Sequence, residues 1–598
     1  MLLRLSFVIS IIPFATRCFV LAIENATTAT AVTLRTRLGT ITGTTMTTIN
    51  DGRAIYAFRG LPYAEPPTGR QRFKPPQAVK PWDDRVLDAT QEGPACPQAI
   101  GINMSEDCLV LNVYTRQLNP DGAVKRLSPV VVFIHPGGMY QKSSQSFIFG
   151  PGYLLERDLV LVTVNYRLAT LGLASTNEAR FPGNLSFKDV VCALEWVRDQ
   201  IVPFAGDPGS VTVTGQSAGS RIITMLMVSP MARGLFHRAI AMSGSLITPI
   251  SPRAGQRELV LKQARLLQCP TSRRSDDDRM YRCLMRRPAE LYGSTVQSFV
   301  EWQGNPTTIW YPTIEPSDTP LEQRFILEEP KASMLKGDIH NVPLVIGITL
   351  NEFKFKAFPG SSESLLKNDS MFKVLAKNWY ELAPIAFQYE RGTARSRWIS
   401  DKLLDYYFKN QTISYRNADA LGQVCFTTDV SKIDIFWSDF LFPSLQLYVD
   451  AIMHFPVYRT ANLIARNSAA PVYYYVFTYQ GPYSIYRWPD TKKPKGGVAH
   501  GDDLQYLFTT TNCIYYANAE FPAYNRTDPA YLYVRRLTSM WESFAKGGDP
   551  LPKDVFGNIT WERYEEGNKY YIEFSEDVTL KRDFHRETMI FWDSLFPI

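Results

Sequence analysis

Several short segments of this chain are rich in apolar and β-branched side chains and are followed by glycine or polar residues. They are 129–134, 159–164, 211–214, 342–348 and 471–477. Residues 190–202 instead carry apolar side chains at helical spacing, at Val191, Leu194, Val197 and Ile201. Apolar strands that alternate with helices are typical of a mostly parallel sheet covered on both faces. The chain is therefore predicted to have an α/β fold.

The length of 598 residues is long for one domain, yet no linker, charge block or repeat divides the chain. A hydrophobic content of 45% and an aromatic content of 13% suffice for a large core. We therefore predict a single domain over 23–598 with long insertions. Thr-rich alternating segments over 35–60 predict an antiparallel hairpin at its start.

The first residues have the pattern of a secretory signal peptide. Arg4 precedes the apolar run 5–16, and Val20-Leu21-Ala22 is a small-residue cleavage site, so 1–22 is predicted to be removed. No later stretch is apolar for long enough to span a membrane, and the C-terminus has no lipid-anchor pattern. The sequence predicts a secreted, extracellular protein with no stable membrane anchor.

Cysteines and glycosylation sequons agree with that location. The chain has eight cysteines, of which Cys18 leaves with the signal peptide, and the pairing of Cys192, Cys425 and Cys513 stays open. Sequons occur at Asn25, Asn103, Asn184, Asn368, Asn410, Asn525 and Asn558, and these asparagines are the candidate glycosylation sites, whose occupancy the sequence does not give.

The charge pattern points away from nucleic acid as a partner. The net charge of +6 is small for this length, and a local group of arginines is interleaved with Asp276, Asp277 and Asp278. No cluster with metal-ligand spacing occurs, so no metal or cofactor is expected. The oligomeric state cannot be inferred from these patterns.

Residues 215–219 read Gly-Gln-Ser-Ala-Gly and follow the strand-like run 211–214. A G-x-S-x-G turn between a strand and a helix places its serine, here Ser217, on a tight elbow with an exposed hydroxyl. The helix-like stretch 218–228 completes this context. Ser217 is thus a candidate nucleophile.

A serine needs a general base, and the chain has only six histidines. His500 lies in the glycine-containing segment 496–501, which suits an exposed loop above a sheet. The others have apolar, charged or strand-leading surroundings that indicate surface or structural roles: His135, His237, His340, His454 and His585. We expect His500 to be the base.

An acid and an oxyanion site complete such chemistry. Glu352 follows the predicted strand 342–348 and is a candidate for the acid. From its position in the sequence alone, it could equally be an ordinary surface carboxylate. Gly137 and Gly138 follow the strand 129–134 and offer backbone N–H groups, as does Ala218 after the nucleophile.

Longer motifs then reveal a resemblance to a known family. Residues 106–113 read Glu-Asp-Cys-Leu-Val-Leu-Asn-Val, and similar matches occur at 58–64, 182–184, 204–208 and 243–245. In this order they resemble the type-B carboxylesterase/cholinesterase family, whose members have the α/β-hydrolase fold. The likeness extends over roughly 32–598.

The resemblance implies roles for individual residues. Ser217 would be the nucleophile, Glu352 the acid and His500 the base, with Gly137, Gly138 and Ala218 as the oxyanion hole. Ser243 would lie close to this triad. The implied disulfides are Cys96–Cys108 and Cys269–Cys283.

The chain also departs from the family pattern. Gln216 stands where the family usually has Glu, a replacement shared with some insect esterases, including juvenile hormone esterases. Pro136 replaces the first glycine of the glycine run. The segment between Cys96 and Cys108 is short and contains no aromatic residue, which argues against the choline site of a cholinesterase.

The sequence therefore predicts a secreted serine carboxylesterase that acts on a small ester through an acyl-enzyme. One alternative is a juvenile-hormone-esterase-type hydrolase of terpenoid methyl esters, with which Gln216 and the spacing Gly497-x-x-His500-x-x-Asp503 agree. A second alternative is a non-catalytic cholinesterase-like adhesion protein. Such chains typically lose triad members, whereas this chain keeps them.

Overall fold

The computed structural model describes most of the chain after residue 29. The described ranges are 30–82, 85–101, 103–248, 256–271, 277–302, 305–315, 319–352, 370–413, 443–484, 497–509 and 523–598. The predicted signal peptide lies outside them, as do Asn25, Asn368, Cys425 and Cys513. Among the described residues, no helix is both long and apolar enough to cross a membrane.

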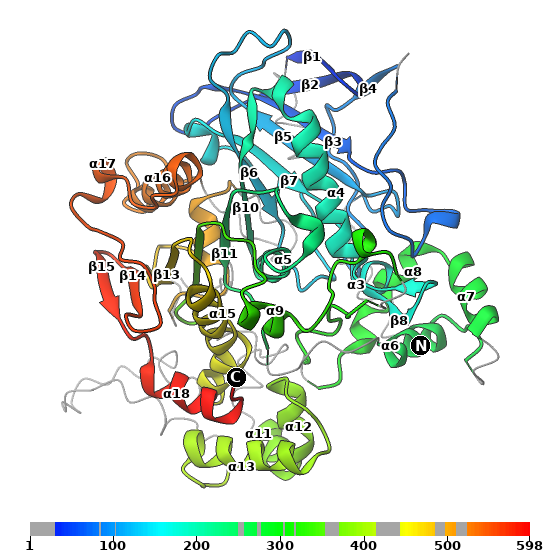
Figure 1. Cartoon of the computed structure of the whole chain (residues 1–598), viewed down its shortest axis with the longest axis vertical. Helices are drawn as coiled ribbons and strands as arrows, with labels where there is room; N and C mark the ends of the chain where they lie inside the picture. The colour runs from blue at the N-terminus through cyan, green and yellow to red at the C-terminus, as the bar shows by residue number, and fades with distance from the viewer. Residues whose placement is uncertain are drawn as a thin grey trace, which may run out of the picture.

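One large sheet runs through the described part of the molecule (Figure 1). Its strands lie in the order β1-β2-β3-β5-β7-β6-β10-β11-β12-β13-β14-β15, and β4 pairs with β2. The pairs from β7 to β14 are parallel, and both ends of the sheet are antiparallel. The strands are β1 (Ala31–Thr36), β2 (Gly39–Thr47), β3 (Ala54–Pro62), β4 (Val86–Asp88), β5 (Val110–Thr115), β6 (Ser128–Ile134), β7 (Val160–Val164), β10 (Gly206–Gln216), β11 (Arg238–Met242), β12 (Leu344–Thr349), β13 (Val472–Phe477), β14 (Tyr570–Phe574) and β15 (Val578–Arg582), with β8 (Ser175–Glu178) and β9 (Phe181–Pro182) forming a separate small sheet.

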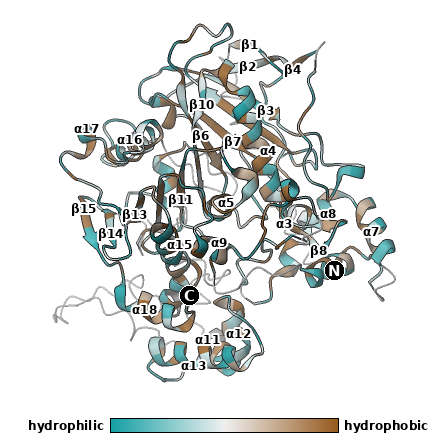
Figure 2. Ribbon diagram, viewed as in Figure 1, coloured by the Kyte–Doolittle hydropathy of each residue, from teal (hydrophilic) through white to brown (hydrophobic). Residues whose placement is uncertain are grey.

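Helices cover both faces of the large sheet (Figure 1). They are α3 (Ala169–Leu173), α4 (Leu185–Gln200), α5 (Ala218–Leu226), α6 (Arg257–Leu266), α7 (Asp277–Arg286), α8 (Ala289–Ser294), α9 (Pro330–Lys336), α11 (Ser370–Lys377), α12 (Trp379–Ala386), α13 (Ala394–Phe408), α14 (Pro443–Val449), the π-helical turn η9 (Asp450–His454), α15 (Phe455–Asn467), α16 (Tyr531–Gly547), α17 (Lys553–Phe556) and α18 (Arg586–Leu595). Figure 2 shows the central strands as the most hydrophobic layer, with polar residues on the outer helices.

Side-chain alternation along β6 divides the interior into two cores. Val130 and Val132 point into the core shared with α4, α5 and α15, whereas Val131 and Phe133 point into the core shared with α16. A strand buried on both faces must be apolar at every position, which is why the segment 129–134 lacks polar residues. The predicted fold class and the predicted antiparallel start of the sheet are confirmed.

Strand β11 (Arg238–Met242) was missing from the predicted set of strands. It has only five residues and begins with an arginine, so its apolar run is too short to stand out. It nevertheless lies between β10 and β12 and so connects the elbow strand with the strand that precedes Glu352.

The disulfides and one glycosylation prediction can be compared directly with the structure. The implied disulfides Cys96–Cys108 and Cys269–Cys283 are both present, and Cys192 is a buried free thiol. At Asn184 the structure argues against a glycan: this side chain is only 1% exposed, and its Nδ2, the atom that would carry a glycan, donates to the Thr313 carbonyl. By contrast, the sequon side chains Asn103, Asn410, Asn525 and Asn558 are exposed.

Candidate active site

Ser217 occupies a strained turn between β10 and α5. Its backbone has φ 56° and ψ −113°, which is unusual for a residue with a side chain. Its N–H donates to the Met242 carbonyl at the end of β11, and its own carbonyl accepts from Arg221 N in the first turn of α5. The elbow is thus held from both sides, as strain at a functional site requires.

The glycines that flank the serine are required by close backbone contacts. A Cβ on Gly219 would lie 2.0 Å from the carbonyl oxygen of Ile134, and a Cβ on Gly215 would lie 2.8 Å from the same atom. Strand β6, which ends at Ile134, therefore approaches the elbow so closely that neither position has room for a side chain. The G-x-S-x-G pattern is explained by this packing.

Glu352 and His500 meet although they are far apart in the sequence. The Nδ1 of His500 lies 2.5 Å from Oε2 of Glu352, and Glu352 is fully buried. The other carboxylate oxygen, Oε1, accepts from Thr349 N at 2.9 Å, so both oxygens are hydrogen-bonded. Because a carboxylate only accepts, Nδ1 carries the proton and Nε2 is left as the basic nitrogen.

Backbone hydrogen bonds join the loops that carry the acid and the base. His500 N donates to the Glu352 carbonyl at 2.8 Å, and Asn351 N donates to the Val498 carbonyl at 3.0 Å. The Asn351 side chain adds a further bond from Val498 N. The relative position of the carboxylate and the imidazole is therefore set by main-chain contacts as well as by their own hydrogen bond.

Gln216 brings the imidazole of His500 to the elbow that carries Ser217. Its amide nitrogen lies 3.1 Å from Nε2 and 3.4 Å from Nδ1 of His500. Gln216 is the residue directly before Ser217, so this contact places the imidazole beside the elbow. The amide is neutral, whereas the residue usual in the family would present a carboxylate here.

The predicted oxyanion loop follows β6 and has an unusual backbone. Gly137 has φ 118° and Gly138 has φ 64°, values that side chains disfavour. A Cβ on Gly138 would collide with the ring of Tyr140, and one on Gly137 would lie 2.0 Å from the Gln141 carbonyl oxygen. Among the described residues, no hydrogen bond uses the N–H groups of Gly137, Gly138 or Ala218. Such free donors suit the binding of a developing negative charge.

His135 shapes this loop instead of acting as a base. Its ring stacks on Tyr166 at a centroid distance of 4.3 Å, and its Nδ1 bonds to the Pro136 carbonyl. Burial lowers the pKa of His135 to about 3, so the ring stays neutral. His340, also predicted to be structural, bonds to the Ser229 carbonyl.

Ser243 is placed next to the elbow by main-chain pairing. It follows Met242, whose carbonyl binds Ser217 N, and its own N–H donates to the Gly347 carbonyl in β12. The side chain is fully buried, and its Oγ has no hydrogen-bond partner among the described residues. The structure thus places Ser243 between the strands that lead to Ser217 and Glu352.

Two ionisable groups near these residues are buried, Asp503 and Arg221, which the sequence patterns did not indicate. Burial, with smaller contributions from Glu352 and Asp502, raises the pKa of Asp503 to about 7. Arg221, one turn after Ser217, is 3% exposed and donates to Thr308 Oγ1 at 2.6 Å, and its Nε has no hydrogen-bond partner among the described residues. Its charge within the otherwise uncharged segment 218–226 was the available clue.

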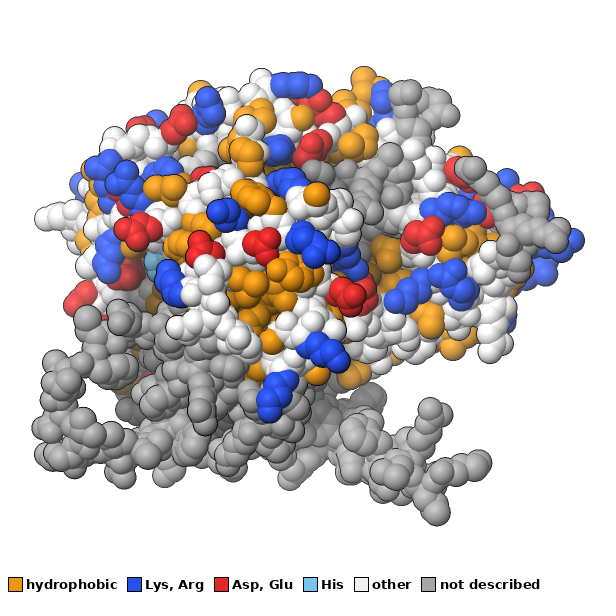
Figure 3. Space-filling view, turned by 90° about the horizontal axis from the view of Figure 1, so that it is seen from below, with side chains coloured by type: hydrophobic (Ala, Val, Ile, Leu, Met, Phe, Trp, Pro, Cys, Tyr) orange, Lys and Arg blue, Asp and Glu red, His pale blue; other side chains and the backbone are white. Residues whose placement is uncertain are grey.

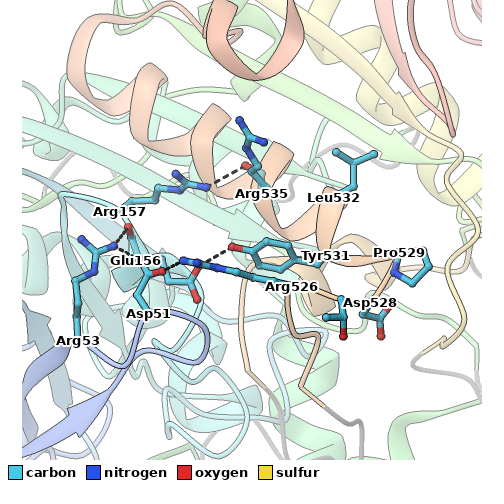
Figure 4. Close-up of a pocket in the computed structure, with 11 residues that line it drawn as sticks. Asp51, Arg53, Glu156, Arg157, Arg526, Asp528, Pro529, Tyr531, Leu532 and Arg535 are labelled. Atoms are coloured by element: carbon cyan, nitrogen blue, oxygen red, sulfur yellow. Dashed lines mark hydrogen bonds and ion pairs between the residues drawn. The ribbon is translucent and has the colours of Figure 1, made fainter.

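A surface pocket of about 670 Å³ lies elsewhere, between the turn after β2 and the start of α16 (Figure 4). Two of its four arginines, Arg53 and Arg526, pair with Asp51. None of the predicted site residues lines it. On the face shown in Figure 3, Lys and Arg side chains are interspersed with Asp and Glu, so that face has no continuous basic surface.

Comparisons with known proteins agree with this architecture. The model of the carboxylesterase family matches residues 30–592. Esterase FE4 of Myzus persicae is 33% identical over 515 residues, covering 84% of this chain and 82% of the relative. Juvenile hormone esterase of Tribolium castaneum is 30% identical over 542 residues, covering 88% and 84%.

A solved structure extends the likeness to three dimensions. The crystal structure of juvenile hormone esterase from Manduca sexta, with OTFP covalently attached, superposes with a TM-score of 0.76 at 27% identity. The match covers 95% of this chain and all of the solved one. Together with the family match, it confirms the α/β-hydrolase fold, and the chain belongs to the carboxylesterase family and is a carboxylic ester hydrolase.

Proposed function

We propose that this protein is a serine carboxylesterase that forms an acyl-enzyme at Ser217. The observation that carries the proposal is the short contact between His500 Nδ1 and Glu352 Oε2 beside the strained elbow. This contact leaves Nε2 of His500 as the base and keeps its ring oriented, which is the function of the acid in such triads.

In the proposed reaction, His500 takes the Ser217 proton as the hydroxyl oxygen attacks the ester carbonyl. The N–H groups of Gly137, Gly138 and Ala218 stabilise the oxyanion, and the protonated His500 gives its proton to the departing alcohol. Water activated by His500 then hydrolyses the acyl-enzyme and releases the acid. Each step uses groups of this chain and no cofactor.

Hydrolysis of a p-nitrophenyl ester by the purified protein tests the proposal. Ser217→Ala should remove turnover, and Glu352→Gln should lower kcat by about 10³–10⁴-fold because the imidazole loses its orientation and the stabilisation of its charge. A phosphonate that reacts with active-site serines should label the peptide that contains Ser217. This labelling would also exclude a non-catalytic role for the protein. Equal turnover by Ser217→Ala and the unmodified chain would contradict the proposal.

A second candidate is a hydrolase of terpenoid methyl esters. Two observations favour it: juvenile hormone esterases are among the relatives, and Gln216 contacts the base where the family usually has Glu. A panel of esters decides between the two candidates. A micromolar KM for a terpenoid methyl ester, well below that for short-chain esters, supports this narrower function, whereas the reverse order supports a general carboxylesterase.

We also propose that the protein is secreted after removal of residues 1–22. The exposed sequons and the two disulfides support an oxidising, extracellular location. Expression of the full chain in insect cells, followed by N-terminal sequencing of protein from the medium, tests this. A product that stays in the cells with Met1 retained would contradict it.

A further inference from the structure

Three metal-ligating side chains meet outside the proposed catalytic machinery. Asp450, His454 and His585 each offer one ligand atom, and these atoms all lie within 4.8 Å of one another. Asp450 and His454 belong to the π-helical turn η9, whereas His585 precedes α18, the last helix of the chain. Asp450 and His454 are fully buried, and His585 is exposed, so the cluster is accessible from one side.

Asp450 holds His454 in one orientation. Its Oδ1 accepts from His454 Nδ1 at 3.0 Å and from Gln446 Nε2 at 2.7 Å, and its Oδ2 accepts from the Tyr407 hydroxyl at 2.8 Å. The proton of His454 therefore lies on Nδ1. A carboxylate bonded to one imidazole nitrogen in this way commonly orients histidines whose other nitrogen binds a metal.

The other nitrogen of His454, Nε2, is buried and has no hydrogen-bond partner among the described residues. A buried polar atom without a partner is destabilising, so its presence needs a reason. The ring of His585 lies nearby, with 5.8 Å between the ring centroids and an interplanar angle of 73°.

The backbone is irregular on both sides of the cluster. A π-helical turn is rare and is often found at functional sites, and here it carries both Asp450 and His454. His585 adopts a left-handed conformation with φ 42° and ψ 45°. Phe584 stacks on the His585 ring and meets the His454 ring edge-on, which gives the cluster an apolar wall.

We propose that Asp450, His454 and His585 form a binding site for Zn²⁺ or a similar divalent transition metal. His454 and His585 supply imidazole nitrogens, Asp450 supplies the negative charge, and water completes the coordination on the exposed side. The bound ion would tie α18 to the segment that precedes α15, and so would stabilise the C-terminal end of the fold.

Metal-free full-length protein, prepared by dialysis against a chelator, allows a direct test. Titration with Zn²⁺ should give one tightly bound ion per chain and a rise in Tm, and Co²⁺ should give the visible absorption of a bound ion. His585→Ala, at an exposed position, should weaken binding at least tenfold and remove the Tm rise. Arg586→Ala, a change at the exposed neighbouring residue, is the matched control and should bind as the unmodified chain does.

Two further variants make the outcome unambiguous. His500→Ala should lose esterase activity and keep the bound Zn²⁺, which separates this site from the proposed catalytic one. Asp450→Asn should weaken Zn²⁺ binding in protein that still hydrolyses ester. Unchanged binding by His585→Ala, or no Zn²⁺ bound by the unmodified chain at micromolar concentration, would overturn the proposal.

Discussion

The side-chain amide of Gln216 lies over the ring of His500, 3.1 Å from Nε2 and 3.4 Å from Nδ1. An amide nearly equidistant from both nitrogens cannot lie in the ring plane, because it would collide with Cε1 between them. It therefore packs on the face of the imidazole and not in the ring plane, where the lone pair of Nε2 lies. The elbow residue most unusual for the family thus contacts the proposed base.

This contact predicts the pH dependence of a Gln216→Glu variant. A carboxylate beside the imidazole favours the protonated ring, which cannot act as a base. The midpoint of the acid limb of kcat/KM should move to higher pH by about one unit or more. Gln216→Met keeps a similar volume without charge and should leave the midpoint within a few tenths of a unit. An unchanged midpoint in the Glu variant would show that residue 216 does not influence the base.

Gly219→Ala should disturb the elbow, because the new Cβ would lie 2.0 Å from the Ile134 carbonyl oxygen. Relief requires β6 and α5 to move apart, and overpacking of this kind typically costs about 1–3 kcal/mol. We expect a lower Tm and a large loss of kcat. Gly547→Ala is the control, since no atom lies within 4 Å of its Cβ position at the end of α16. Equal Tm and kcat in both variants would contradict the packing described for the elbow.

Asp503→Asn should change how stability depends on pH. The pKa of Asp503 is about 7 in the folded chain and close to 3.8 when unfolded, so folding favours its protonated form. As pH rises from about 4 to 7, the unfolded chain releases this proton first, and stability on the order of 2–4 kcal/mol is lost. The Asn variant has no such proton. Its Tm should therefore exceed that of the unmodified chain at pH 8, with the difference shrinking toward pH 4.

The neighbouring Asp502 provides the control for this experiment. Its carboxylate accepts from Ala499 N and from Ser484 Oγ, each at 2.8 Å, so Asp502→Asn should be destabilising at pH 8. By contrast, Oδ1 of Asp503 has no partner among the described residues. Parallel curves of Tm against pH for Asp503→Asn and the unmodified chain would argue against a raised pKa.

Asn184 should remain unglycosylated when the chain is expressed in insect cells. Both ends of its amide bond to the backbone of Thr313, at 2.7 and 2.9 Å, and the side chain is buried. Enzymatic deglycosylation in heavy-oxygen water, followed by peptide mass spectrometry, should label exposed sequons such as Asn103 or Asn558 and leave Asn184 unlabelled. A labelled Asn184 peptide from folded, active enzyme would contradict this prediction.

Sequence alone determined the features that depend on local patterns. Apolar runs predicted the central strands, because a strand buried on both faces excludes polar side chains. The strand and glycines around Ser217 predicted the elbow, because the tight turn requires small residues at positions adjacent in the sequence. Glu352 could be chosen among 58 acidic residues only through family motifs, since a carboxylate after a strand is too common to be informative.

The tertiary structure decided the features that depend on contacts between distant segments. Three features arise from how loops pack over the sheet: the approach of Gln216 to His500, the burial of Asn184 against Thr313, and the lack of a partner for Asp503 Oδ1 among the described residues. The Asp450–His454–His585 cluster has no metal spacing in the chain, because one of its histidines comes from another element. Periodicity and turn patterns depend only on residues that are close in the sequence. These sites form only when folding brings distant backbone segments together.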